Sequence, residues 1–161
     1  MAERPQPAGG HVRPLTAVAF GTAAFIALLI FGLGMTSLVL GEDVIATPGL
    51  GQVPGIIATA LATIAFAGGL WAAVRRPHPS FWGAAWTTAA AYLAYLVGVW
   101  LGGVATGADA ALAASVAGRI ATSWFGVVIA AAGLISAWGG IALVRTDARR
   151  PRWPWEDEFD E

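Results

Sequence analysis

The chain has 161 residues, of which 57% are hydrophobic and 12% are charged, with a formal net charge of −1 at pH 7. A soluble domain carries about 25% charged residues, and a chain this short has too much surface to bury so much apolar material. The composition therefore predicts a membrane protein, and the absence of cysteine excludes disulfides, thiolate catalysis and cysteine metal sites.

The polar N-terminal segment, residues 1–14, contains Arg4 and Arg13 and is rich in proline and glycine, which predicts a disordered cytoplasmic arm. Residues 15–41 follow without an ionisable side chain, and about 20 apolar residues suffice to cross the hydrocarbon core. A secretory signal peptide has an apolar region of only about 7–15 residues. We therefore expect a retained first transmembrane helix.

Three further apolar stretches predict transmembrane helices at residues 54–74, 81–104 and 120–144. Asp109 can act as the N-cap of a helix that continues into the fourth span, although residues 110–118 could instead lie on the outer surface. We expect an all-α, polytopic membrane protein whose four-helix domain, residues 15–144, is arranged as two hairpins of consecutive spans.

The arginines predict the orientation. Cytoplasmic segments of membrane proteins carry an excess of basic residues, and eight of the nine arginines fall in the N-terminal arm, the connection between the second and third spans, and the tail. Only Arg119 falls on the other side. This asymmetry predicts that both termini are cytoplasmic in the plasma membrane.

Small residues recur every fourth position in the third and fourth spans, where they would form flat faces on the helices. Such faces let membrane helices approach closely, either within one bundle or against a partner's helix. The residues concerned are Ala90, Ala94, Gly98, Gly102, Gly126, Ala130, Ser136 and Gly140.

The sequence offers few residues that could form a catalytic, metal or cofactor site. The four spans contain no ionisable side chain, and His11 and His78 fall on the side opposite Glu42 and Asp43, so no metal or cofactor site is predicted. No nucleophile–base pair is visible, which predicts a non-enzymatic protein. Arg119 is the nearest intramembrane candidate: its charge could reach the outer headgroups by snorkelling or be a buried functional charge.

The tail, residues 145–161, runs from basic to aromatic to acidic. Its arginines would attract anionic headgroups, and its aromatic residues could rest in the interface or anchor a cytoplasmic protein partner. No nucleic-acid partner is expected. The residues predicted to contact lipid or a partner are Arg145, Arg149, Arg150, Arg152, Trp153, Trp155 and Phe159.

Three features of the sequence are shared with a known group of proteins. They are the alanine- and glycine-rich spans, the absence of lysine, and the tail sequence Arg149-Arg150-Pro151-Arg152-Trp153-Pro154-Trp155-Glu156. With these features the chain resembles small four-helix membrane proteins of actinobacteria whose function is unknown. The resemblance covers the whole chain. It implies a plasma-membrane location and implies no catalytic residue.

Two functions are therefore expected from the sequence. The first is an accessory or scaffold subunit that packs with itself or with a partner. The alternative is a small transporter or channel subunit whose path is lined by hydroxyl side chains, for which the candidates are Thr59, Thr63, Thr87, Thr88, Tyr92, Tyr95, Thr122 and Ser123.

Overall fold

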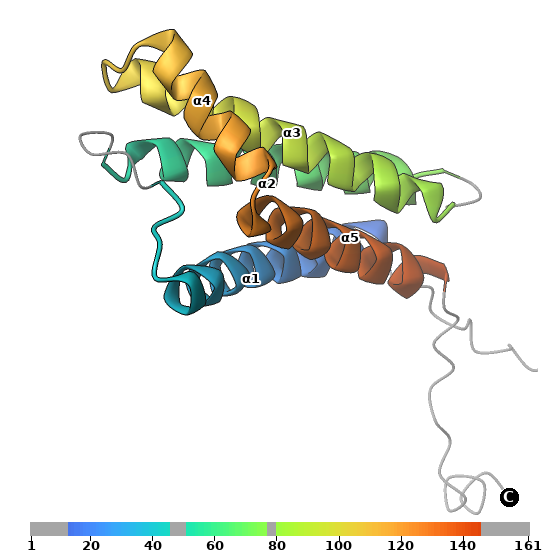
Figure 1. Cartoon of the computed structure of the whole chain (residues 1–161). Coiled ribbons are helices and arrows are strands. Elements are labelled where there is room, and N and C mark those ends of the chain that lie inside the picture. Colours follow the sequence, from blue (N-terminus) through green and yellow to red (C-terminus); the bar gives the residue numbers. More distant parts are fainter. Residues whose placement is uncertain (1–12, 46–50, 77–79, 146–161) are drawn as a thin grey trace, which may run out of the picture.

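The computed structural model describes residues 13–45, 51–76 and 80–145, which form five α-helices and no strand (Figure 1). Four of the helices are long and apolar enough to cross a membrane, so an all-α fold with four apolar spans is confirmed. These are α1 (Pro14–Leu40), α2 (Val53–Val74), α3 (Trp82–Ala105) and α5 (Trp124–Arg145), and the shorter α4 (Ala110–Ala121) lies between α3 and α5.

The ends of the first three spans lie within one residue of the predicted ranges, and local chemistry explains them. Pro14 occupies the first turn of α1 and Pro54 the first turn of α2, where a missing N–H costs nothing. α1 ends at Gly41, which adopts a φ of 66° and donates its backbone N–H to the Ser37 carbonyl oxygen. That left-handed conformation favours glycine.

The fourth span differs from the prediction, because the chain breaks at Thr122 and Ser123 and α5 begins only at Trp124. Asp109 does cap a helix, with its carboxylate accepting from the backbone N–H groups of Ala111 at 2.8 Å and Leu112 at 3.4 Å. That helix is α4, however, and it does not continue into the span. Figure 1 shows α4 running obliquely back over α3 before α5 starts.

The break is stable in an apolar setting because the carbonyl groups at the end of α4 find donors, as backbone groups away from water must. Tyr92 Oη donates to the Ala121 carbonyl oxygen at 3.0 Å, and Ser123 Oγ donates to the Ile120 carbonyl oxygen at 3.0 Å. A Cβ at Gly126 would lie 2.7 Å from that Ile120 oxygen. Only glycine therefore lets α5 start this close to α4.

The helices pair differently from the predicted hairpins. The most extensive contacts join α2 with α3 and α1 with α5, while α1 and α2 share much less. Figure 1 accordingly shows one layer formed by α2, α3 and α4 above a second layer formed by α1 and α5. The pairing follows the closest backbone approaches, because a Cβ at Gly98 would lie 2.4 Å from Ala58 Cα and one at Gly102 would lie 2.5 Å from Pro54 Cα.

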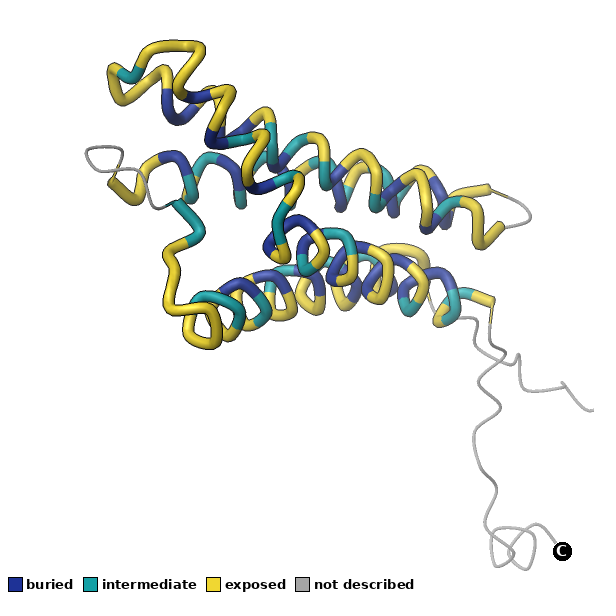
Figure 2. Tube along the Cα trace, in the orientation of Figure 1, coloured by how far each residue is buried: buried dark blue, intermediate teal, exposed yellow. Residues whose placement is uncertain are grey.

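Each spanning helix buries one narrow face, and its other positions are half-buried or exposed (Figure 2). On α1 the buried positions recur every fourth residue, at Ala17, Gly21, Phe25, Leu29 and Leu33, which is one helix face. Large apolar side chains cover the opposite side. Such a surface is suited to contact with lipid chains.

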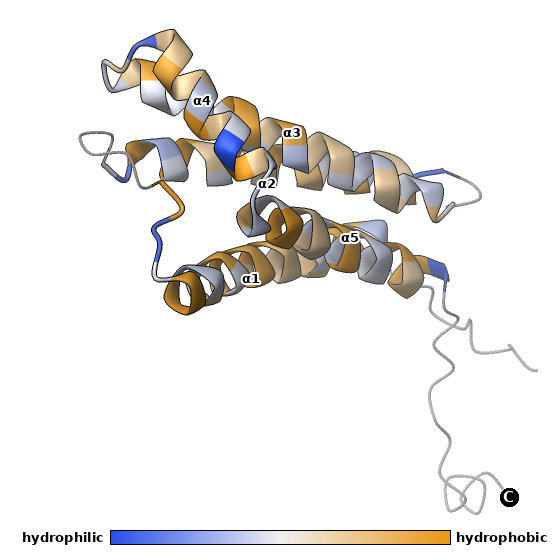
Figure 3. Ribbon diagram, in the orientation of Figure 1, coloured by the Kyte–Doolittle hydropathy of each residue, from blue (hydrophilic) through white to orange (hydrophobic). Residues whose placement is uncertain are grey.

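The two ends of the bundle differ in charge, and strongly hydrophilic positions gather near them and on α4 (Figure 3). We call the end where α1 begins and α5 ends the arginine end, because Arg13, Arg75 and Arg145 lie there. We call the opposite end, where α1 ends and α2 begins, the acidic end, because it carries Glu42 and Asp43.

Candidate functional site

A cleft of about 1000 Å³ opens between α1 and α2 at the acidic end of the bundle. Ile30 of α1, Ile56 and Ala60 of α2, and Val44 and Ile45 of the connection between these helices supply its apolar walls. Most of its lining is therefore hydrocarbon.

Polar groups occupy the two extremes of the cleft. Asp43 and Gln52 lie at the mouth, beside the ends of α1 and α2. Thr59 and Tyr95, contributed by α2 and α3, line it farther from the mouth. An apolar body with a few polar groups at fixed places is the usual composition of a ligand site.

Toward the arginine end, α1 and α2 meet through an aromatic contact. The rings of Phe25 and Phe66 stack with their centroids 4.4 Å apart and their planes 2° apart, and both side chains are fully buried. Ile30 and Ala60 follow one to two helical turns beyond this stack. α1 and α2 are thus joined at the level of the two rings and leave the cleft between their remaining turns.

Three charged side chains meet next to the mouth. Glu42, Asp43 and Arg119 line a second, smaller cavity of about 110 Å³, and Asp43 lines both spaces. Two carboxylates and one guanidinium leave one negative charge uncompensated, which attracts cations and disfavours anions at the mouth.

Arg119 is exposed and lies in the last turn of α4. A positive charge there interacts favourably with the helix dipole. The guanidinium also shares its cavity with the acidic residues of the α1–α2 connection. Its charge is therefore not buried inside the bundle.

Tyr95 is the most enclosed polar residue of the cleft, with 2% of its surface exposed. Among the described residues its hydroxyl has no hydrogen-bond partner, whereas the hydroxyl of Tyr92 on the same helix donates to Ala121. The fully enclosed hydroxyls without a partner are those of Thr22, Thr88 and Ser136. Since the Tyr95 oxygen is not among them, it keeps access to the cleft that the residue lines.

Two of the other candidate hydroxyls for a path donate to backbone carbonyl groups four residues earlier in the chain. Thr63 Oγ1 donates to the Thr59 carbonyl oxygen at 2.7 Å, and Thr122 Oγ1 donates to the Gly118 carbonyl oxygen at 3.0 Å.

Thr87 and Thr88 occupy close helix contacts. A Cβ at Gly69 would lie 3.1 Å from Thr87 Oγ1, and one at Gly133 would lie 3.2 Å from Thr88 Cγ2. The described hydroxyls therefore form no continuous polar path across the bundle.

The small residues singled out in the sequence fall into two groups. Gly98, Gly102, Gly126, Ser136 and Gly140 are buried, and the four glycines lie against neighbouring elements of the same chain. Ala94 and Ala130 are half-buried and Ala90 is exposed.

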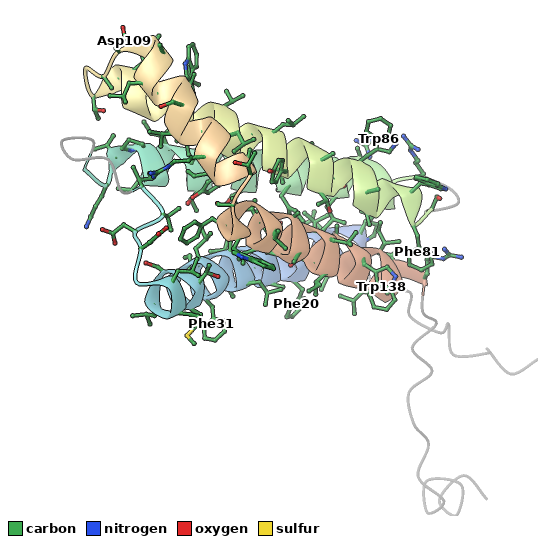
Figure 4. The ribbon with its side chains drawn as sticks, in the orientation of Figure 1. Phe20, Phe31, Phe81, Trp86, Asp109 and Trp138 are labelled. Carbon is green, nitrogen blue, oxygen red and sulfur yellow. The ribbon has the colours of Figure 1, made fainter. Side chains whose placement is uncertain are left out.

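At the arginine end, arginine side chains lie over aromatic rings, and Figure 4 shows Phe81 beside Trp138. The Arg145 guanidinium carbon lies 4.5 Å from the Phe81 ring centroid, and Phe81 stacks on Trp138 with a centroid distance of 6.1 Å. The other tail residues predicted to contact lipid or a partner, namely Arg149, Arg150, Arg152, Trp153, Trp155 and Phe159, lie outside the described residues.

Sequence reasoning did not assign the cleft. The glycine- and proline-rich connection before α2 indicates a loop, but it does not indicate that α1 and α2 separate beside it. In the sequence, Tyr95 is only one of eight candidate hydroxyls for a path. Its distinguishing feature, a buried hydroxyl without a partner, is visible only once the helices are packed.

Within the described residues, no three His, Cys, Asp or Glu side chains come together as metal ligands. No curated protein and no solved structure matches this chain. A comparison with protein families does match residues 12–161, nearly the whole chain, in agreement with the expected relation to a family of unknown function. On this evidence the chain belongs to the family of unknown function DUF6121.

Proposed function

We propose that this protein is a non-enzymatic accessory protein of the plasma membrane that holds a lipid-soluble molecule in the cleft between α1 and α2. The observation that carries the proposal is the cleft itself, with about 1000 Å³ between helices that are apolar enough to cross a membrane. Sites for small molecules measure about 300–1,000 Å³ and are mostly apolar.

The length of the cleft favours a small molecule over a partner's transmembrane helix. From Ile30 to the end of α1 at Leu40 is about 15 Å at roughly 1.5 Å per residue. The hydrocarbon core is about 30 Å thick, so the cleft covers about half of it. A helix crossing the whole core would run into the stacked rings of Phe25 and Phe66. A single hydrocarbon chain fits between these rings and the acidic end.

In this proposal the arginine end lies in the cytoplasm and the cleft faces the outer leaflet. Arg13, Arg75, Arg76 and Arg145 favour this orientation, because basic residues accumulate on the cytoplasmic side. A reporter that is active only in the cytoplasm should therefore give signal at either terminus, and a reporter that is active only outside should give none. Termini on opposite sides would contradict the orientation.

The cleft can be tested by labelling two isoleucines of α2. Ile56 lines the cleft and Ile64 does not, yet their exposed fractions are nearly equal, 64% and 68%. The full chain in nanodiscs would be labelled with a long-chain fatty alcohol that carries a diazirine, and the labelled residues mapped by mass spectrometry. We expect excess unlabelled fatty alcohol to reduce labelling at Ile56 several-fold and to leave Ile64 unchanged, because only a site saturates.

Two substitutions that replace an alanine by tryptophan, one inside the cleft and one outside it, complete the test. Ala60→Trp fills the cleft and should abolish the competed labelling at Ile56, while Ala90→Trp, at an exposed alanine of α3 outside the cleft, should keep it. Labelling that fails to saturate at Ile56 in the unchanged chain would show that the cleft holds only bulk lipid, and the proposed function would then be wrong.

A further inference from the structure

The unpartnered hydroxyl of Tyr95 indicates what kind of molecule the cleft takes. A phenol oxygen can donate one hydrogen bond and accept others, and leaving it unpaired away from water has a free-energy cost. The Tyr95 side chain is almost fully buried, yet none of the described residues bonds to its oxygen. The cleft that Tyr95 lines is therefore the place from which a bound molecule would reach this hydroxyl.

The depth of Tyr95 constrains this partner. The residue lies about 20 Å from the start of α3 at Trp82 and about 15 Å from its end at Ala105, at roughly 1.5 Å per residue. This is near the middle of the hydrocarbon core, where a charged group would be strongly disfavoured.

Among neutral polar groups, a carbonyl oxygen suits this position best. It accepts hydrogen bonds and has no donor of its own, so one bond from a tyrosine hydroxyl leaves no donor unpaired. A ligand hydroxyl or amide would bring an N–H or O–H that needs an acceptor as well. The remaining walls, such as Ile30, Ile56 and Ala60, are suited to a hydrocarbon chain.

We propose that the cleft takes a neutral, lipid-soluble molecule with a carbonyl group on a hydrocarbon chain, and that the Tyr95 hydroxyl donates a hydrogen bond to the carbonyl oxygen. This inference rests on the proposed function, since it requires that the cleft binds a molecule. It adds the chemical class of the ligand and the residue that selects it.

The test compares two competitors of equal chain length, 2-undecanone and undecane, in the labelling experiment at Ile56. With the unchanged chain, the ketone should compete at about threefold to tenfold lower concentration than the alkane, which is what one net hydrogen bond provides. In Tyr95→Phe this ratio should fall to near one. Tyr92→Phe is the matched control and should keep the ratio, because its hydroxyl already donates to Ala121 and does not line the cleft.

The outcomes separate the two proposals. If both competitors act equally on the unchanged chain, the cleft binds apolar molecules and the Tyr95 inference is wrong. If neither competes while unlabelled fatty alcohol still does, the Tyr95 inference is wrong and the proposed function stands; if the fatty alcohol also fails to compete, the proposed function is wrong. Should Tyr95→Phe not fold, the infrared carbonyl band of bound 2-undecanone on the unchanged chain decides: a lower frequency than in empty nanodiscs supports the hydrogen bond, and an equal frequency overturns it.

Discussion

Replacing Gly98 with alanine should lower the free energy of unfolding by about 2–3 kcal/mol, the cost of forcing an extra methyl group into a packed contact. The new Cβ would lie 2.4 Å from Ala58 Cα and 2.9 Å from the Ala58 backbone nitrogen. Backbone atoms cannot rotate away as the end of a side chain can, so α3 would have to move off α2. Unfolding by SDS in mixed micelles, followed by tryptophan fluorescence, measures the change.

Gly68→Ala is the control for that substitution, because a Cβ at Gly68 would meet nothing within 4 Å. It should change stability by less than about 1 kcal/mol, in the stabilising direction, since alanine favours helix over glycine. Equal losses at the two positions would show that α2 and α3 do not meet through Gly98.

Phe25→Ala should have the next largest effect and lower the free energy of unfolding by about 2 kcal/mol. Truncating a buried phenylalanine in a water-soluble protein costs about 3–5 kcal/mol, part of which is transfer out of water. In a bilayer that part is small, because the separated helices are still surrounded by hydrocarbon, and the cavity and the lost stacking on Phe66 remain.

Phe20→Ala removes the same side chain from the same helix at a position that is 65% exposed. It leaves no cavity and should cost less than about 0.5 kcal/mol in the same SDS unfolding measurement. The two phenylalanine variants should also differ in ligand binding. Removing the ring of Phe25 extends the cleft toward the arginine end, so longer hydrocarbon competitors should then bind relatively better, whereas Phe20→Ala should leave the preference for chain length unchanged.

The proposed ligand site bears on the choice between the two functions expected from the sequence, an accessory protein and a transporter or channel subunit. A transport path needs polar groups that continue from one side of the membrane to the other. Thr59 and Tyr95 line the cleft, whereas Thr63 and Thr122 donate to backbone carbonyl groups and Thr87 and Thr88 lie in close helix contacts. At the level of Phe25 and Phe66, α1 and α2 are in contact and the two rings are fully buried. A binding role, in which a molecule is held rather than passed through, fits this geometry.

The broken fourth span illustrates why sequence reasoning reached only part of the fold. Asp109 signals a helix start, and the residues from Ala110 to Arg145 contain no proline, so nothing local announces an interruption. The break at Thr122 and Ser123 is held by Tyr92, which comes from a different helix. A contact between segments about 30 residues apart is not visible in the pattern of either segment.

The sequence by itself determined that the chain is all-α, that it is suited to the membrane, and where three of its four spans begin and end. These properties depend on about 20 consecutive residues at a time and on capping groups next to them. The tertiary structure decided which helices pair, where the fourth span breaks, and that α1 and α2 leave a cleft that Tyr95 lines. Those features depend on which small residues meet across helices, because lipid solvates every apolar face equally well and only close packing distinguishes one arrangement from another.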